Sequence, residues 1–216
     1  MLTFAEELLL LVHDEKRGSF HDMQDMLFDA ALAGAVLMDL AIRNRIDTDL
    51  EKLVVLDRTP TGEKLLDHGL ARLGRDPTIA TTADALDLLR KEGAAIQEMA
   101  LERLVERGIL RRDAQRILWV FEARRYPLID GKELREVKLR ISELIFSDTI
   151  PDPADVVIIS LANTCGLLDR VFSEDEVRRS RARIEQLAKL DLIGQATDAM
   201  LMELSTVLTS VLMRYG

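Results

Sequence analysis

Cysteine and aromatic residues are scarce in this sequence. Its 216 residues include one cysteine, Cys165, one tryptophan and only 4% aromatic residues in total. A single cysteine excludes an intramolecular disulfide framework and any zinc site built from several cysteines. Leu, Ala, Ile and Met dominate instead, and this mixture favours helices over sheets. We therefore expect a mainly helical protein in which Cys165 is a buried structural thiol.

Positive charge is also in short supply. The 29 Lys and Arg residues face 38 Asp and Glu residues, which gives a net charge of -9. This balance counts against broad nucleic-acid binding, and against adsorption to an acidic membrane unless basic residues cluster. The apolar run at 8–12 is too short to cross a bilayer and follows Glu6 and Glu7, where a signal peptide carries positive charge. Asp198 and Glu203 interrupt the apolar stretch at 196–213, so a cytoplasmic protein without a transmembrane segment is expected.

Motifs that carry enzymatic chemistry are missing. The three histidines, His13, His21 and His68, form no His-Glu-x-x-His zinc motif, and we expect them to be exposed or in turns. The sequence contains no Gly-x-Ser-x-Gly nucleophile elbow, and the segment 60–64 lacks the first glycine of a Walker-type phosphate loop. These observations make an enzyme the weaker class, although they do not exclude catalysis by paired carboxylates, and we expect no cofactor or metal.

Capping patterns and apolar periodicity predict a chain of helices. Thr3 with Glu6, and Ser173 with Glu176, have the Ser/Thr-x-x-Glu spacing of a capping box. The nearly all-apolar segment 154–172 is expected to be the central helix. Strand propensity marks 46–50, 53–56 and 117–122, with 124–128 as the return side of the last hairpin. The expected helices are 4–12, 22–43, 63–73, 82–89, 94–107, 133–146, 154–172, 173–190 and 196–213.

One supersecondary pattern occurs twice. The segments 40–46 and 104–110 each read as the end of a helix and a tight basic turn, followed by strand-like residues. This order resembles a winged helix, so DNA binding is a remote alternative. The helix before the second hairpin would repel phosphates because it carries acidic residues, namely Glu92, Glu98, Glu102 and Glu106.

Six segments along the chain have a distinctive order, namely Leu2–Leu10, Ala31–Ile46, Pro60–Asp67, Arg103–Leu110, Tyr126–Leu128 and Val156–Phe172. In this order they resemble the Golgi phosphoprotein 3 family, including its bacterial members. The resemblance covers almost the whole chain, so we expect residues 1–216 to form a single domain.

The resemblance implies a helical fold around a central hydrophobic helix, with a projecting β-hairpin and no enzymatic activity. Eukaryotic members of the family are peripheral membrane proteins that bind phosphatidylinositol 4-phosphate and the tails of Golgi glycosyltransferases. Their hairpin also mediates self-association. By resemblance, the oligomerisation hairpin of this chain includes Trp119, Phe121, Arg124, Arg125 and Tyr126.

The sequence departs from the family at the lipid pocket. The family places a tryptophan and three arginines around the headgroup, whereas the matching positions here are His21 or Gln24, Ala33, Ala94 and Gln97. Alanine and glutamine do not replace the charge-assisted donors that a phosphomonoester requires. Substitutes near the family pocket are Phe20, His21, Arg90 and Lys91; the alternative is a solvated Arg-Lys pair and a core-facing Phe.

Two hypotheses follow for the function. The first is a peripheral membrane or adaptor protein that binds an anionic phospholipid headgroup, on the cytoplasmic face of a membrane. The second is a cytosolic protein-interaction module, without lipid binding, that associates through the hairpin and an apolar groove. For the arginines near the hairpin, a basic patch and pairing with surplus acids remain alternatives; these residues are Arg111, Arg112, Arg124 and Arg125.

Overall fold

A computed structural model describes residues 1–20, 26–48, 52–76, 79–117, 121–164, 166–188 and 206. His21, Gln24, Trp119, Cys165 and the helix expected at 196–213, apart from Thr206, lie outside these described residues. The elements are α1 (Phe4–Leu11), β1 (His13–Asp14), β2 (Ser19–Phe20), α2 (Met26–Ile42), β3 (Ile46–Thr48), β4 (Leu53–Val55), α3 (Lys64–Arg75), α4 (Thr82–Arg90), α5 (Gly93–Glu106), β5 (Asp113–Ile117), β6 (Phe121–Arg125), α6 (Lys132–Phe146), α7 (Pro153–Thr164), α8 (Leu168–Val171) and α9 (Glu174–Ala188). The mainly helical fold predicted from composition is confirmed.

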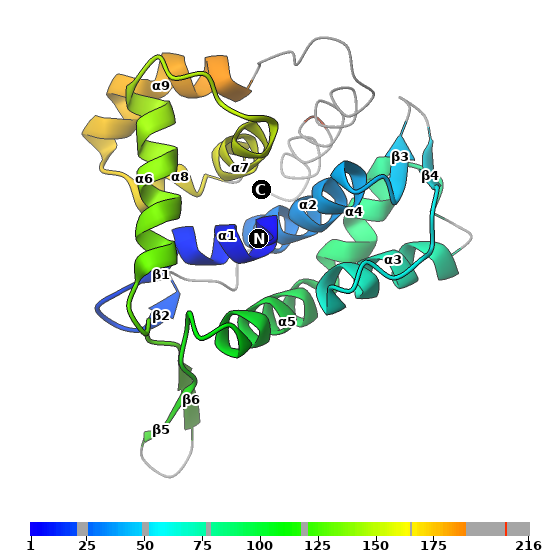
Figure 1. Cartoon of the computed structure of the whole chain (residues 1–216), viewed down its shortest axis with the longest axis horizontal. Helices are drawn as coiled ribbons and strands as arrows, with labels where there is room; N and C mark the ends of the chain where they lie inside the picture. Colours follow the sequence, from blue (N-terminus) through cyan, green and yellow to red (C-terminus); the bar gives the residue numbers. More distant parts are fainter. Residues whose placement is uncertain are drawn as a thin grey trace.

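Helix α2 forms the centre of the molecule (Figure 1). It packs against α1, α3, α4, α5 and α7. Small residues along α2, including Ala30 and Ala33, are fully buried and let its neighbours approach closely. The prediction that 154–172 forms one central helix is wrong, because Gly166 (φ +64°) ends α7 and the chain continues as the short α8.

Helix α1, which is buried on all sides, and helix α9 both begin at a capping box. Thr3 and Glu6 form the predicted capping box, in which Thr3 N–H donates to Glu6 Oε2 (2.6 Å) and Glu6 N–H donates to Thr3 Oγ1 (3.3 Å). The second predicted box also forms, with Ser173 N–H donating to Glu176 Oε2 (2.8 Å). These local contacts fix where α1 and α9 begin.

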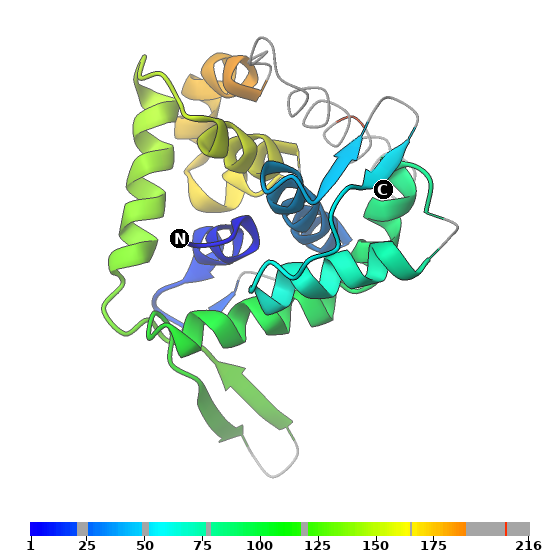
Figure 2. The ribbon, with the colours of Figure 1, turned by 45° about the vertical axis from the view of Figure 1, so that its right-hand side comes forward.

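The repeated helix–hairpin unit is present in both places. Helix α2 ends at a turn with Asn44 at φ +53° and leads into the antiparallel pair β3–β4. Helix α5 ends at Gly108 (φ +68°) and leads into β5–β6. Figure 2 shows that the second hairpin projects away from the helical body.

The register of the β5–β6 hairpin corrects the sequence prediction. A single strand was expected over 117–122, but Ile117 pairs with Phe121, so the chain reverses inside that stretch. The polar residues from Asp113 onward form the outgoing strand, because the ladder to β6 supplies their backbone hydrogen bonds. Strand propensity located the apolar residues but not the turn between them.

In the part of the chain that the structure covers, none of the helices combines the length and the apolar character needed to cross a membrane.

Candidate functional site

Tyr126 fastens the projecting hairpin to the body. Its side chain is only 5% exposed, and its N–H donates to the carbonyl of Gly18 (2.7 Å). Its own carbonyl lies 2.8 Å from His13 Nε2, and its ring centroid is 6.0 Å from that of Phe20. The hairpin base is therefore attached directly to the β1–β2 ribbon.

His13 is part of this attachment, which corrects the expectation of an exposed histidine. The residue is 2% exposed, and its ring meets the Phe20 ring edge to face at 5.2 Å. Burial lowers the pKa of His13, because the charged imidazolium is poorly solvated there. The neutral ring is thus the form that suits the site at neutral pH.

Two arginines at the hairpin base are engaged by neighbouring groups. Arg112 forms an ion pair with Glu98, lies over the Tyr126 ring at 5.7 Å and donates to the Tyr126 hydroxyl (3.2 Å). Arg111 donates twice to Asp113, at 2.9 and 3.0 Å. For this pair, the structure selects partnership with acids over an open basic patch.

The hairpin residues expected to mediate association lie on strand β6 and just after it. Phe121 and Arg124 pair through the backbone with Ile117 and Ala114, and Arg125 is exposed. Tyr126 follows the strand and is buried at its base. The base of the hairpin is thus anchored through Tyr126.

The substitutes expected near the family's lipid pocket have other neighbours. At the end of α4, Asp87 accepts a hydrogen bond from Arg90 (2.6 Å) and forms an ion pair with Lys91 (2.7 Å). Hydrogen bonds from these two cations lower the pKa of Asp87. Phe20 is half-buried and packs on His13 and Tyr126. The cations and the aromatic ring therefore serve separate parts of the fold.

A carboxylate lies beside the positions where the family has arginines. Ala33 is buried on α2, whereas Ala94 is exposed at the start of α5 and Gln97 is half-buried. Asp29, one turn before Ala33, lies so close to Gly93 that any side chain at position 93 would collide with its carboxylate. A negative charge at this place opposes the binding of a phosphate.

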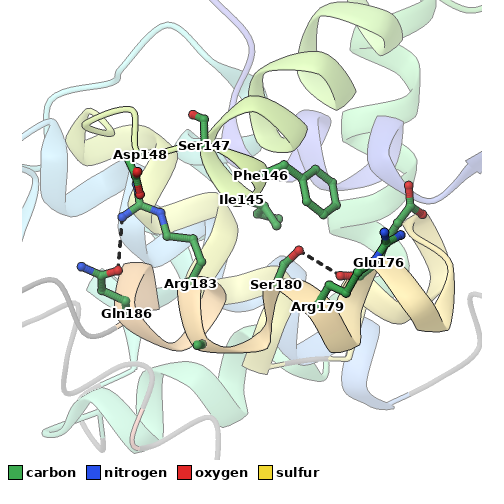
Figure 3. Close-up of a pocket in the computed structure, with 10 residues that line it drawn as sticks. Ile145, Phe146, Ser147, Asp148, Glu176, Arg179, Ser180, Arg183 and Gln186 are labelled. Carbon is green, nitrogen blue, oxygen red and sulfur yellow. Dashed lines mark hydrogen bonds between the residues drawn. The ribbon is translucent and has the colours of Figure 1, made fainter.

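A cavity in the described part of the chain lies between the end of α6 and α9. It measures about 600 Å³, and Figure 3 shows the polar side chains around it. Arg183 donates to the carbonyls of Leu144 (3.2 Å) and Thr149 (2.7 Å), and Ser180 donates to the Glu176 carbonyl (2.9 Å). Arg183 thus joins α9 to the end of α6 and to the segment after it, whereas the Ser180 bond lies within α9. The cavity is therefore mainly a site of helix packing. Sequence reasoning missed it, although the four arginines of α9 were a signal.

Buried charges connect α1 to four other helices, and the sequence did not indicate this. Glu6 is fully buried and binds Arg103 of α5 (2.7 Å), which also binds Glu63 (2.6 Å). Glu7 pairs with Arg140 of α6, which also contacts Asp155 of α7 (2.7 Å). Burial raises the pKa of Glu6, Glu7 and Asp155. The arginine partners therefore only partly offset the loss of hydration that these carboxylates undergo on burial.

Asp39 of α2 completes this network. Its Oδ2 accepts a hydrogen bond from the Phe4 N–H (2.8 Å), at the N-terminus of α1, where backbone N–H groups have no partner within the helix. Arg43 is 3.6 Å away and lowers the pKa only partly, so desolvation raises the pKa of Asp39 to about 6. Among the described residues, no group of three His, Cys, Asp or Glu side chains is arranged to hold a metal ion.

These features define a helical scaffold that presents a projecting hairpin. Residues 4–204 match the sequence model of the family described as Golgi phosphoprotein 3 (GPP34). The chain is also similar to vacuolar protein sorting-associated protein 74 of Eremothecium gossypii, with 27% identity over 225 residues, covering 86% of this chain and 67% of that protein. The chain belongs to the Golgi phosphoprotein 3 family.

Proposed function

We propose that this protein is a non-enzymatic peripheral membrane adaptor whose projecting hairpin contacts an anionic lipid surface. The observation that carries the proposal is the β5–β6 register. Because Ile117 pairs with Phe121, the sequence Ile-Leu-Trp-Val-Phe spans the reversal of the hairpin. The β5–β6 strands project from the helical body (Figure 2), and in this proposal the apolar segment that joins them contacts the lipid.

The composition of the hairpin suits a membrane interface. Tryptophan is enriched at the boundary between lipid headgroups and acyl chains, because its ring is both apolar and able to donate a hydrogen bond. Arg124 and Arg125 follow the apolar residues along β6. Basic residues near an anionic leaflet each contribute on the order of 1 kcal/mol of attraction. The hairpin thereby offsets, locally, the acidic balance of the chain.

The family suggests phosphatidylinositol 4-phosphate as the headgroup. In this chain, Arg90 and Lys91 at the end of α4 would supply the cations for this headgroup. Binding a phosphate there requires both cations to release Asp87, which they hold at 2.6 and 2.7 Å. We therefore expect weaker headgroup selectivity than a pocket with three unpaired arginines would give.

Membrane flotation tests the proposal. The protein is mixed with vesicles of phosphatidylcholine alone, with added phosphatidylserine, or with added phosphatidylinositol 4-phosphate, at low and moderate salt. We expect flotation with both anionic compositions, loss of flotation in Trp119→Ser, and a weaker salt-sensitive component in Arg124→Gln/Arg125→Gln. Arg178→Gln/Arg181→Gln, at two exposed positions of α9, is the charge-matched control. Absence of flotation with every anionic vesicle would refute the membrane proposal.

A second function is favoured by the carboxylates near the family pocket. Asp29 lies over the start of α5, and Asp87 binds both candidate cations. These acids favour a protein-interaction module without lipid binding, in which the hairpin associates with a protein or with a second copy of the chain. Light scattering coupled to size exclusion, on wild type and Trp119→Ser, measures self-association. A larger molar mass for the wild type than for the variant, together with no flotation on any vesicle, would select this function.

A further inference from the structure

A cleft separates the loop 57–62 from the outer face of α3. Its volume is about 280 Å³, and the residues that matter most in it are Arg58 on the loop and Arg75 at the end of the helix. Gly74 precedes Arg75 on α3, and the guanidinium carbon of Arg58 is 3.5 Å from the position that a Cβ on Gly74 would occupy. The two arginines thus flank the same end of the cleft.

Neither arginine has an acidic partner within the described part of the chain, although this protein has nine more acidic than basic charges. Elsewhere in the same region, Arg45 pairs with Asp57 and Arg72 with Glu92 (2.7 Å). Two guanidinium groups that face one cleft repel each other unless an anion lies between them. Guanidinium groups also match the oxygen geometry of phosphate, because each presents parallel N–H donors.

The loop that carries Arg58 is fixed on both sides of it. Asp57 accepts hydrogen bonds from Thr59 N–H (2.8 Å) and Thr59 Oγ1 (2.6 Å). Asp67 of α3 accepts from Thr61 N–H (2.5 Å) and Thr61 Oγ1 (2.7 Å). Since the loop is already held in place, a ligand does not need to order it, and this lowers the cost of binding.

The acidic residue of the cleft lies at its opposite end. Asp67 and Gly74 are seven positions apart on α3, which corresponds to about 10 Å along the helix axis. One oxygen of Asp67 is occupied by the Thr61 donors. Leu70 lies between the two ends and gives the cleft an apolar floor. The site therefore has a cationic end and an apolar middle.

We infer that this cleft binds a phosphate monoester, with the phosphate between Arg58 and Arg75 and the attached group over Leu70. The phosphate belongs either to a soluble ester or to a lipid headgroup, and both present the same dianion. This site is separate from the hairpin and from the α4–α5 corner, so it does not depend on the function proposed above.

Calorimetric titration with phenyl phosphate, a soluble monoester, tests the inference on the full chain. We expect saturable binding by the wild type, and about tenfold or greater weakening in Arg58→Gln and in Arg75→Gln, since each loses a charge-assisted bond. Arg181→Gln removes the same charge from a different exposed helix and is expected to bind like the wild type. All three positions are exposed, and circular dichroism checks that each variant is folded.

A second arm separates the two sources of the phosphate. Phosphatidylcholine vesicles with and without phosphatidic acid are floated with Trp119→Ser, in which the hairpin contact is removed, and with the same variant carrying Arg58→Gln. Flotation that requires Arg58 assigns the site to a lipid headgroup, whereas binding of phenyl phosphate alone assigns it to a soluble ester. Absence of saturable binding in both arms, or equal affinity in Arg58→Gln and Arg181→Gln, would overturn the inference.

Discussion

Asp39 gives the protein a stability that should rise as the pH falls from neutrality. Its carboxylate is buried between α1 and α2, where it accepts the Phe4 N–H bond and faces Arg43 and Glu6. Burial raises its pKa from an ordinary value of 3.8 to about 6. A carboxyl group with a raised pKa in the folded state favours folding when it is protonated. Its contribution is complete below the unfolded pKa and is lost as the pH rises through the folded pKa.

The size of the effect follows from these two pKa values. Their difference corresponds to about 3 kcal/mol between full protonation and full ionisation. Lowering the pH from about 7.5 to about 5 protonates most of the folded-state group and recovers about 1.4 kcal/mol of this. Glu7 and Asp155 have raised pKa values and add in the same direction. His13 acts in the opposite direction, because its pKa is lowered in the folded state. Below the unfolded pKa of histidine, protonation therefore favours the unfolded chain.

Chemical denaturation at a series of pH values, on wild type and Asp39→Asn, measures this effect. The amide of Asp39→Asn still accepts the Phe4 N–H bond but does not ionise. On lowering the pH from about 7.5 to about 5, the unfolding free energy of the variant should therefore rise by about 1.4 kcal/mol less than that of the wild type. Asp39→Ala, which removes the acceptor, should be less stable than Asp39→Asn by about 1–3 kcal/mol at every pH. An identical pH dependence in wild type and Asp39→Asn would refute the reasoning.

Three further predictions concern unfolding free energies measured by urea denaturation at neutral pH. Tyr126→Ala should cost about 3 kcal/mol because it removes a buried ring, whereas Tyr126→Phe should cost about 1 kcal/mol or less; equal costs would contradict the anchoring role. Gly18 and Gly62 both have positive φ, so Gly62→Ala, which has open space around it, should cost about 1–2 kcal/mol. Gly18→Ala should cost clearly more, since its Cβ would also lie 3.2 Å from a backbone atom. Arg103→Met should cost about 3 kcal/mol by leaving Glu6 buried without its cation, and a loss that does not shrink at lower pH would contradict this explanation.

Features set by neighbouring residues were predictable from the sequence. The capping boxes at Thr3 and Ser173 depend on contacts three residues apart, and both form. The pairing of Arg90 and Lys91 with Asp87 has the same character, because spacings of three and four bring side chains together on a helix. That pairing was readable from the sequence, and it bears directly on the proposed lipid site.

Features set by distant residues were not predictable. The burial of His13 depends on the Tyr126 carbonyl, which is 113 positions away in the sequence. The hairpin turn depends on the ladder between Ile117 and Phe121, and apolar strand propensity does not locate it. The cleft at Arg58 joins a loop to a helix face, so no linear motif marks it. By contrast, the break after α7 had a local signal in Gly166, which the surrounding apolar pattern concealed.

The hairpin carries the only tryptophan of the chain, so intrinsic fluorescence reports on the proposed contact without any label. The most direct measurement is the emission of Trp119 during titration with phosphatidylcholine vesicles that contain phosphatidylinositol 4-phosphate. We predict a shift of the emission to shorter wavelength, quenching by brominated lipid, and reduced quenching by iodide in the aqueous phase. Unchanged emission, with full access of iodide at saturating anionic lipid, would contradict the proposal that the hairpin binds membranes.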